Sequence, residues 1–98
     1  MNIVVSGRNI EITPTLRAYA EEKISKFDEK YQLNITGASV TLTVQKHRHK
    51  AEVVVKAKGE VIKAEAATEE LYSAIDEVVD KLDKQLKKSK DKRVKRRK

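Results

Sequence analysis

The sequence contains no cysteine and no tryptophan, and its 98 residues include one proline, three glycines, three tyrosines and one phenylalanine. Without cysteine, disulfide bonds and thiol chemistry are excluded, and this absence fits a reducing cytoplasm. Because aromatic side chains are scarce, a hydrophobic core has to be built from Val, Ile, Leu and Ala. A chain of this length predicts one domain, which would bury more than ~60% of the surface that the unfolded chain exposes.

Long apolar segments and catalytic motifs are also missing from the sequence. No apolar run approaches the ~20 residues that a membrane span requires, and the first residues lack the charged and long apolar regions of a secretory signal. There is no Cys-x-x-Cys pair, no glycine-rich phosphate loop, and no nucleophile with a plausible base beside it. The sequence therefore predicts a soluble, intracellular protein that is not an enzyme and needs no cofactor.

Two histidines, His47 and His49, come closest to a metal-binding pattern. They are predicted to lie at a hairpin tip and to point to opposite faces of a strand. Nothing nearby supplies the further ligands that a metal ion needs. No metal site is therefore predicted, and a binding role for the tip is the better interpretation.

The positive charge lies almost entirely at the C-terminal end of the chain. Residues 1–83 hold twelve Lys or Arg and fourteen Asp or Glu, a net charge of −2. Residues 84–98 hold ten Lys or Arg and one acid, Asp91, a net charge of +9, and the two parts sum to +7. Clustered cations release counterions from phosphate groups far better than dispersed ones, so this end predicts binding to a polyanion. The alternative is a solvated tail that only aids solubility.

Apolar periodicity in the first part of the chain predicts a strand followed by a helix. Residues 2–6 are a β-branched apolar run ended by Gly7, which predicts a short buried strand. Thr13 and Pro14 have the residue types of a helix N-cap and of a first helical position. The residues behind them recur at spacings of four and three as one apolar stripe, Leu16, Ala20, Ile24, Phe27 and Tyr31.

Alternation of apolar and polar residues then predicts three strands. It extends over 38–45 and 51–58, and a weaker strand follows over 61–67, with turns at 46–50 and at Gly59. Thr68 is predicted to cap a second helix, whose apolar stripe is Leu71, Ile75, Val78, Leu82 and Leu86. Tyr72, one residue outside this stripe, is predicted to pack at the seam between the two helices rather than to stack on a base.

The predicted order is β-α-β-β-β-α, an α+β fold. Three consecutive hairpin-linked strands imply a four-stranded, mostly antiparallel sheet, and two helices with one apolar stripe each must cover one of its faces. The other face is then exposed and polar, with side chains such as Thr41, Thr43, Lys56 and Lys63.

Both predicted helices carry a basic and an acidic edge beside the apolar stripe. The basic edge of the first helix consists of Lys23, Lys26 and Lys30. That of the second consists of Lys81, Gln85 and Lys88, with Lys84 alongside. The acids on the other flank of the second helix are Asp76, Asp80 and Asp83. If the helices lie side by side, one basic edge from each could face a common groove, and the alternative is ordinary helix solvation with dipole matching.

The segment from Gly7 through 9–14 to Tyr19, and the longer block from Ala64 to Lys90, resemble the family of ribosome hibernation promoting factors, also called ribosome-associated translation inhibitors. The second block is the more specific, because Tyr-Ser-Ala-Ile-Asp at 72–76 and Asp-Lys-Leu at 80–82 occur together. The resemblance covers essentially the whole chain.

The resemblance implies the topology of double-stranded RNA-binding domains and a cytoplasmic protein of bacteria or organelles. Such a protein occupies the small ribosomal subunit between head and body, overlaps messenger RNA and A- and P-site transfer RNA, and inhibits translation in idle ribosomes. It implies no membrane and no small-molecule substrate. The family's ribosomal-RNA contacts fall on Lys81, Lys84, Lys87, Lys88, Lys90 and Lys92, and less closely on Lys23, Lys26, Lys30 and Arg48.

Residues 1–90 are predicted to form a single ribosome-binding domain, and residues 91–98 a basic, disordered tail or the start of a linker. Short family members end near here, whereas long ones continue through a linker into a second domain that pairs two ribosomes. The segment 92–95 resembles such a linker, so the chain fits a short form or the N-terminal domain of a long form. Dimerisation would need that further domain. Lys84 stands where many relatives are expected to have Arg, which keeps the charge but loses bidentate phosphate geometry.

Two other functions are compatible with the same residues. One is a general double-stranded RNA-binding module, which would grip any RNA duplex by its shape. The other is a protein-interaction domain whose docking surface is an exposed sheet edge or an acidic helix flank.

Overall fold

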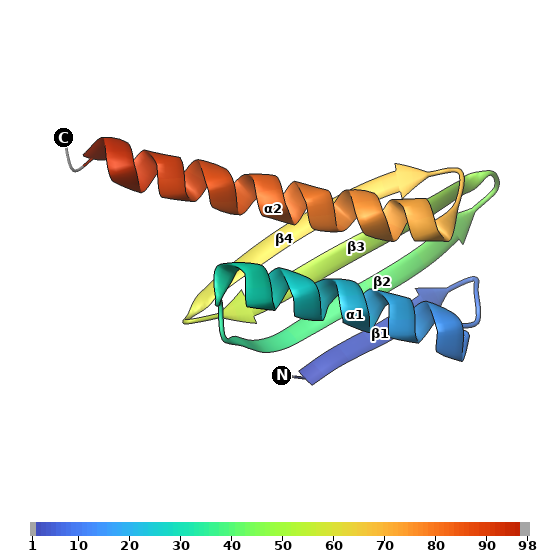
Figure 1. Ribbon diagram of the computed structural model, residues 1–98. Helices are drawn as coiled ribbons and strands as arrows, with labels where there is room; N and C mark the ends of the chain where they lie inside the picture. Colours follow the sequence, from blue (N-terminus) through green and yellow to red (C-terminus); the bar gives the residue numbers. More distant parts are fainter. Residues whose placement is uncertain (1, 97–98) are drawn as a thin grey trace.

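The computed structural model describes the backbone of residues 2–96 and the side chains of residues 2–87, and it has the predicted order of elements (Figure 1). They are β1 (Asn2–Arg8), α1 (Pro14–Tyr31), β2 (Ile35–Gln45), β3 (Arg48–Ala57), β4 (Glu60–Thr68) and α2 (Leu71–Arg96). The sheet order is β1-β2-β3-β4, parallel between β1 and β2 and antiparallel elsewhere. This confirms the predicted α+β fold and its mostly antiparallel sheet.

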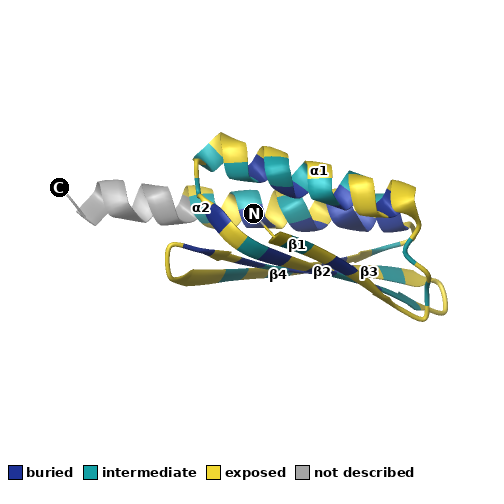
Figure 2. Cartoon of the chain, turned by 90° about the horizontal axis from the view of Figure 1, so that it is seen from below, coloured by how far each residue is buried: buried dark blue, intermediate teal, exposed yellow. Residues whose placement is uncertain are grey.

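The strand register gathers the alternating apolar residues on one face of the sheet. One row across all four strands pairs Val5 with Val40, Val40 with Val53, and Val53 with Ala64. Since side chains alternate between faces along a strand, the intervening polar residues point the other way. Both helices lie over the apolar face, as Figure 2 shows, and the opposite face is open to solvent.

Helix α1 begins and packs as its sequence predicts. Thr13 is the N-cap, because its Oγ1 accepts a hydrogen bond from the Leu16 N–H at 3.1 Å, and Pro14 follows in the first turn. The helix ends at Gln32, whose left-handed backbone (φ 48°) directs its N–H to the last carbonyls. Of the predicted stripe, Tyr31 is half-buried and the buried residues are Leu16, Ala20, Ile24 and Phe27.

Strand β1 is longer and less buried than predicted. It continues past Gly7 to Arg8, and Val5 is its one fully buried residue. Gly7 stays in the ladder opposite Leu42, and a Cβ at this position would lie 2.6 Å from the Ile10 carbonyl oxygen. The glycine therefore permits the following segment to fold closely over the strand, and it does not end the strand.

Helix α2 begins later than the prediction of a Thr68 cap implies. Thr68 is still paired with His49 in the β3–β4 ladder, and the first helical residue is Leu71. The Ala74 N–H bonds to the Glu70 carbonyl oxygen at 3.0 Å, so Glu70 occupies the cap position. Thr68 Oγ1 instead accepts a hydrogen bond from the Glu70 N–H at 3.2 Å, which forms a tight turn before the helix.

The apolar stripe of α2 lies on the sheet as predicted. Its buried residues are Leu71, Ile75, Val78 and Leu82, and Leu86 is half-buried. The helix continues to Arg96 and so passes the domain boundary predicted at residue 90. The separation of 91–98 as a tail or the start of a linker stays a prediction. None of the helices in the described part of the chain is long and apolar enough to cross a membrane.

We expect Ile75→Ala to lower the free energy of unfolding by about 2–5 kcal/mol, because it leaves a cavity between α2 and the sheet, where Ile75 is 2% exposed. Urea unfolding followed by circular dichroism measures the loss. The control is Val4→Ala, since Val4 is 53% exposed, and its expected cost is below about 0.5 kcal/mol. Equal losses in the two variants would contradict this placement of the core.

Candidate nucleic-acid interface

The predicted binding residues fall on three parts of the molecule. Those on α1 are Lys23, Lys26 and Lys30, and those on α2 with described side chains are Lys81, Lys84 and Lys87. Arg48 begins β3, next to the turn that joins it to β2, and this turn and the C-terminal end of α2 lie at opposite ends of the molecule (Figure 1). The side chains of Lys88, Lys90 and Lys92 lie outside the described residues.

The groove between the two helices has one basic wall and one acidic wall. The Lys23 Nζ lies 3.3 Å from Asp76, and the Lys30 Nζ lies 2.9 Å from Asp83. These side chains line an open cavity of about 300 Å³. The prediction that a basic edge from each helix could face one groove was therefore wrong, because α1 turns its basic edge toward the acidic edge of α2.

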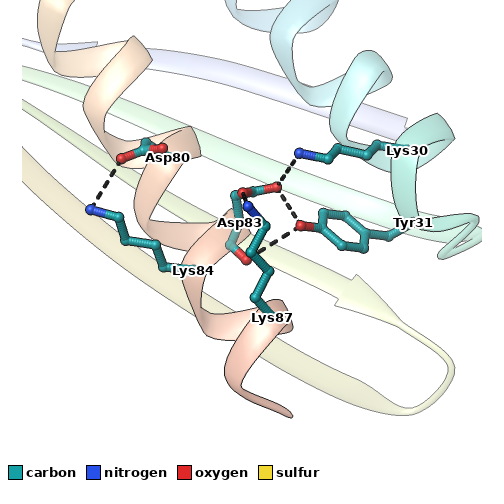
Figure 3. A network of polar contacts seen from close by, with 6 residues as sticks. All are labelled: Lys30, Tyr31, Asp80, Asp83, Lys84 and Lys87. Atoms are coloured by element: carbon teal, nitrogen blue, oxygen red, sulfur yellow. Dashed lines mark hydrogen bonds and ion pairs between the residues drawn. The ribbon is translucent and has the colours of Figure 1, made fainter. Parts of the chain in front are cut away.

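Asp83 is shared by three donors from both helices (Figure 3). Its carboxylate accepts a hydrogen bond from the Tyr31 hydroxyl at 2.5 Å and pairs with Lys30 at 2.9 Å and with Lys87 at 3.3 Å. Its side chain is 14% exposed, and these donors, Tyr31 first, lower the pKa of Asp83 to about 2. Burial, followed by the hydrogen bond to Asp83, raises the pKa of Tyr31. Asp83 therefore stays ionised and ties the end of α1 to α2.

Asp76 links the same two helices nearer the start of α2. It accepts a hydrogen bond from the Tyr19 hydroxyl at 2.5 Å, and this bond, with burial and the nearby charge, raises the pKa of Tyr19 to about 12. Tyr72 packs edge-on against Tyr19, with ring centroids 4.9 Å apart. This contact confirms the predicted place of Tyr72 at the seam between the helices.

Lys81 and Gln85 do not face the groove. Both reach over the β4 edge of the sheet, where the Lys81 Nζ donates to the Glu65 carbonyl oxygen at 2.9 Å and the Gln85 Nε2 donates to that of Lys63 at 2.7 Å. Because β4 is the last strand, these two contacts occupy carbonyl groups that could otherwise pair with a further strand. Lys81 thus contributes to the fold as well as to the surface charge.

The two remaining helix lysines form ion pairs within their own helix. Lys26 pairs with Glu22 at 3.1 Å and Lys84 with Asp80 at 3.4 Å, each one turn away. Every predicted binding lysine whose side chain is described therefore has a carboxylate or carbonyl partner. Exposed ion pairs of this kind contribute little to stability, so another anion can replace the carboxylate at little cost.

The hairpin tip around Arg48 differs from the helices in its charge pairing. Its turn is Lys46–His47, shorter than the predicted segment 46–50, because residues 48–50 already pair in β3. Arg48 is exposed and makes no ion pair within residues 2–87. His47 and His49 both line one open cavity of about 730 Å³. His47 lies in the turn and His49 in β3, so the two do not share one strand, as the prediction of opposite strand faces assumed. The described residues hold no group of three or more side chains that could bind a metal ion.

The sequence reasoning placed acids on one flank of the second helix but missed that they pair with the lysines of the two helices. Asp76, Asp80 and Asp83 recur at spacings of four and three, and the lysines of α1 recur at three and four. Matching spacings of opposite charge on two helices were the available signal that the two flanks could pair across a groove.

The chain matches known proteins over nearly its whole length. Residues 3–94 match a family described as Sigma 54 modulation protein / S30EA ribosomal protein. The chain is 40% identical over 96 residues to the ribosome hibernation promoting factor of Azotobacter vinelandii, with 98% of this chain and 89% of the relative covered. It is 42% identical over 98 residues to the ribosome hibernation promotion factor of Deinococcus radiodurans, covering 95% of this chain and 51% of that longer relative.

Two solved structures have a closely similar fold. A ribosomal subunit interface protein from Coxiella burnetii superposes with a TM-score of 0.82 at 28% identity, over 92% of this chain and 98% of the other. The N-terminal domain of Protein Y from Thermus thermophilus superposes with a TM-score of 0.80 at 38% identity, over 90% and 98%.

The fold shared with these structures and the family match over residues 3–94 place the chain in a class of non-enzymatic, ribosome-associated factors. The chain belongs to the ribosome hibernation promoting factor family, since the family match covers residues 3–94 and relatives are about 40% identical over nearly the whole chain. Membership confirms the resemblance drawn from the sequence and the prediction that the protein is not an enzyme.

We expect Asp83→Asn to lower the free energy of unfolding at pH 7 and to have little effect near pH 2. The folded pKa of about 2 lies below the ordinary value of 3.8, so ionised Asp83 stabilises the fold above pH 3.8. This contribution is lost as the pH falls toward 2. After allowance for solvent screening, the difference at pH 7 is on the order of 1–2 kcal/mol.

Urea unfolding of both proteins across this pH range measures the difference. Asp80→Asn is the control, because the Asp80 side chain is 59% exposed and its effect should be small at every pH. A deficit in Asp83→Asn that persists unchanged at pH 2 would show that the carboxylate charge is not its cause.

Proposed function

We propose that this chain is a ribosome hibernation factor that acts by steric occlusion in the cytoplasm of a bacterium or organelle. It binds the small ribosomal subunit between head and body, blocks messenger RNA and A- and P-site transfer RNA, and so inhibits translation in idle ribosomes. The observation that carries the proposal is the family match over residues 3–94. The names of the relatives, ribosome hibernation promoting factors, support the same function.

The shape of the molecule is compatible with occlusion. It is an elongated body with extents of 49 × 26 × 18 Å. Its helices are held to one sheet face by their apolar stripes and to one another by the contacts of Asp76 and Asp83. A body fixed in this way can fill a channel without any chemical step.

Ribosomal RNA would be contacted mainly by the outward-facing lysines of α2. Lys84 and Lys87 are 71% and 63% exposed, and they begin the segment 84–98 with its net charge of +9. Contacts to phosphate position a protein but carry little sequence information, so specificity would come from the shape of the subunit. The further proposed contacts are Lys81, Lys88, Lys90, Lys92, Lys23, Lys26, Lys30 and Arg48.

Co-sedimentation with purified bacterial ribosomes tests the proposal. The protein should migrate with the small subunit or the whole ribosome, saturably and one to one, at near-physiological salt and with excess RNA duplex as competitor. Ribosomes with the protein bound should translate a reporter message poorly. If the duplex removes the protein from ribosomes, a general double-stranded RNA-binding module is the better description.

Lys84→Gln with Lys87→Gln should weaken ribosome binding and flatten the slope of log affinity against log salt by about two, near one for each lost phosphate contact. Glutamine removes the charge and keeps the helix propensity. The matched control is Lys56→Gln with Lys63→Gln, which removes the same charge from exposed positions on the open sheet face. Equal slopes for the two pairs would exclude Lys84 and Lys87 from the interface.

A further inference from the structure

The lysines proposed to contact RNA are already engaged with carboxylates of the same chain. Five of them, Lys23, Lys26, Lys30, Lys84 and Lys87, pair with four acids, Glu22, Asp76, Asp80 and Asp83. This set of nine side chains has a net charge of +1, from five positive and four negative groups. The described part of the helix surface is therefore a mixed-charge surface, whereas the strong excess of positive charge belongs to the segment 84–98.

We infer that the acidic flank of α2, which consists of Asp76, Asp80 and Asp83, determines specificity by competing with RNA phosphates for the lysines with which it pairs. These lysines are Lys23, Lys30, Lys84 and Lys87. The inference rests on the proposed function in one respect, that these lysines bind RNA. The acidic flank lowers affinity for bulk RNA and favours a partner surface that carries both phosphates and cationic groups, as a surface of RNA and protein does.

The competition follows from the chemistry of the two acceptors. Carboxylate and phosphate oxygens accept hydrogen bonds from the same ammonium group, so a phosphate that binds Lys23 or Lys84 has to replace an existing partner. The displaced carboxylate then remains close to the phosphate with no cation of its own. A lysine already neutralised by an acid also contributes less to counterion release, which supplies most of non-specific RNA affinity.

A mixed surface avoids this penalty. If the partner supplies a cation opposite each carboxylate and a phosphate opposite each ammonium group, both members of the pair gain a new contact. A bare RNA duplex offers phosphates alone. Its phosphates can bind the lysines, but they are repelled by the neighbouring carboxylates. The acidic flank therefore penalises the duplex more than the mixed surface.

The members of the acidic flank differ in how far they also support the fold. Asp83 is 14% exposed and holds Tyr31, so its removal would disturb the packing of α1. Asp76 and Asp80 are 50% and 59% exposed, and asparagine at position 76 keeps an acceptor for the Tyr19 hydroxyl. Asp76→Asn with Asp80→Asn is accordingly the informative variant.

The experiment measures affinity for an RNA duplex of about 20 base pairs and for purified ribosomes by fluorescence anisotropy over a salt series. Asp76→Asn with Asp80→Asn should bind the duplex about tenfold more tightly, with a salt slope steeper by one to two units, about one per freed lysine. Its affinity for ribosomes should change by less than about threefold, so that the ratio of the two affinities falls.

The matched control is Glu52→Gln with Glu60→Gln, which makes the same change in net charge at exposed positions that form no ion pair within residues 2–87. The inference fails if the control gains as much duplex affinity as the aspartate variant. It also fails if the aspartate variant gains equally for ribosomes and duplex, because the acids would then lower affinity without discriminating.

Failure of this inference is distinguishable from failure of the proposed function. If the unchanged protein does not bind ribosomes, the proposed function is wrong, while the duplex comparison still decides whether the acids compete with RNA. Urea unfolding shows whether the double variant is folded. If the double variant is not folded, the single variant Asp80→Asn is tested instead, because Lys84 is the one ion-pair partner of Asp80 within residues 2–87. An unchanged duplex affinity of this single variant overturns the inference.

Discussion

Two helices have to share one face of a four-stranded sheet, and this packing decides where their charged side chains lie. Each helix is oriented by its apolar stripe, with residues such as Ile24 and Ile75 turned to the sheet. One flank of α1 is then directed toward α2, where Lys30 meets Asp83. The ion pairs between the helices thus follow from the burial of the stripes, which supplies most of the stabilisation.

Much of the fold could be predicted from the sequence, because periodicity and helix capping are local properties. The Thr13-Pro14 start of α1 and the alternation through β2 and β3 each depend on a few neighbouring residues. Thr68 was misassigned because its hydrogen-bonding state depends on His49, which is distant in sequence and holds it in the sheet. Gly7 was misread as the end of a strand because its close neighbour is the carbonyl group of Ile10 after the chain folds back.

The positions of the lysines on the helix flanks could be predicted from the sequence, but the groups that they contact could not. Periodicity places Lys23 and Lys81 on helix flanks, yet it does not say which flank faces the other helix and which faces a sheet edge. That depends on the strand order and on where each helix lies over the sheet. As a result, Lys81 was placed on a basic edge that could face the groove, whereas the structure directs it to the Glu65 carbonyl at the β4 edge.

Charge in this chain is divided between a nearly neutral body and a strongly basic end, and the two parts suit different tasks. On the proposed function, the end with a net charge of +9 would supply affinity that falls steeply with salt and is indifferent to the RNA that carries the phosphates. A protein that relied on this end alone would be distributed over all the RNA of the cell. On the inference drawn from the ion pairs, the mixed-charge groove between α1 and α2 would supply what the basic end lacks. Its carboxylates would make RNA binding depend on whether cationic groups lie beside the phosphates.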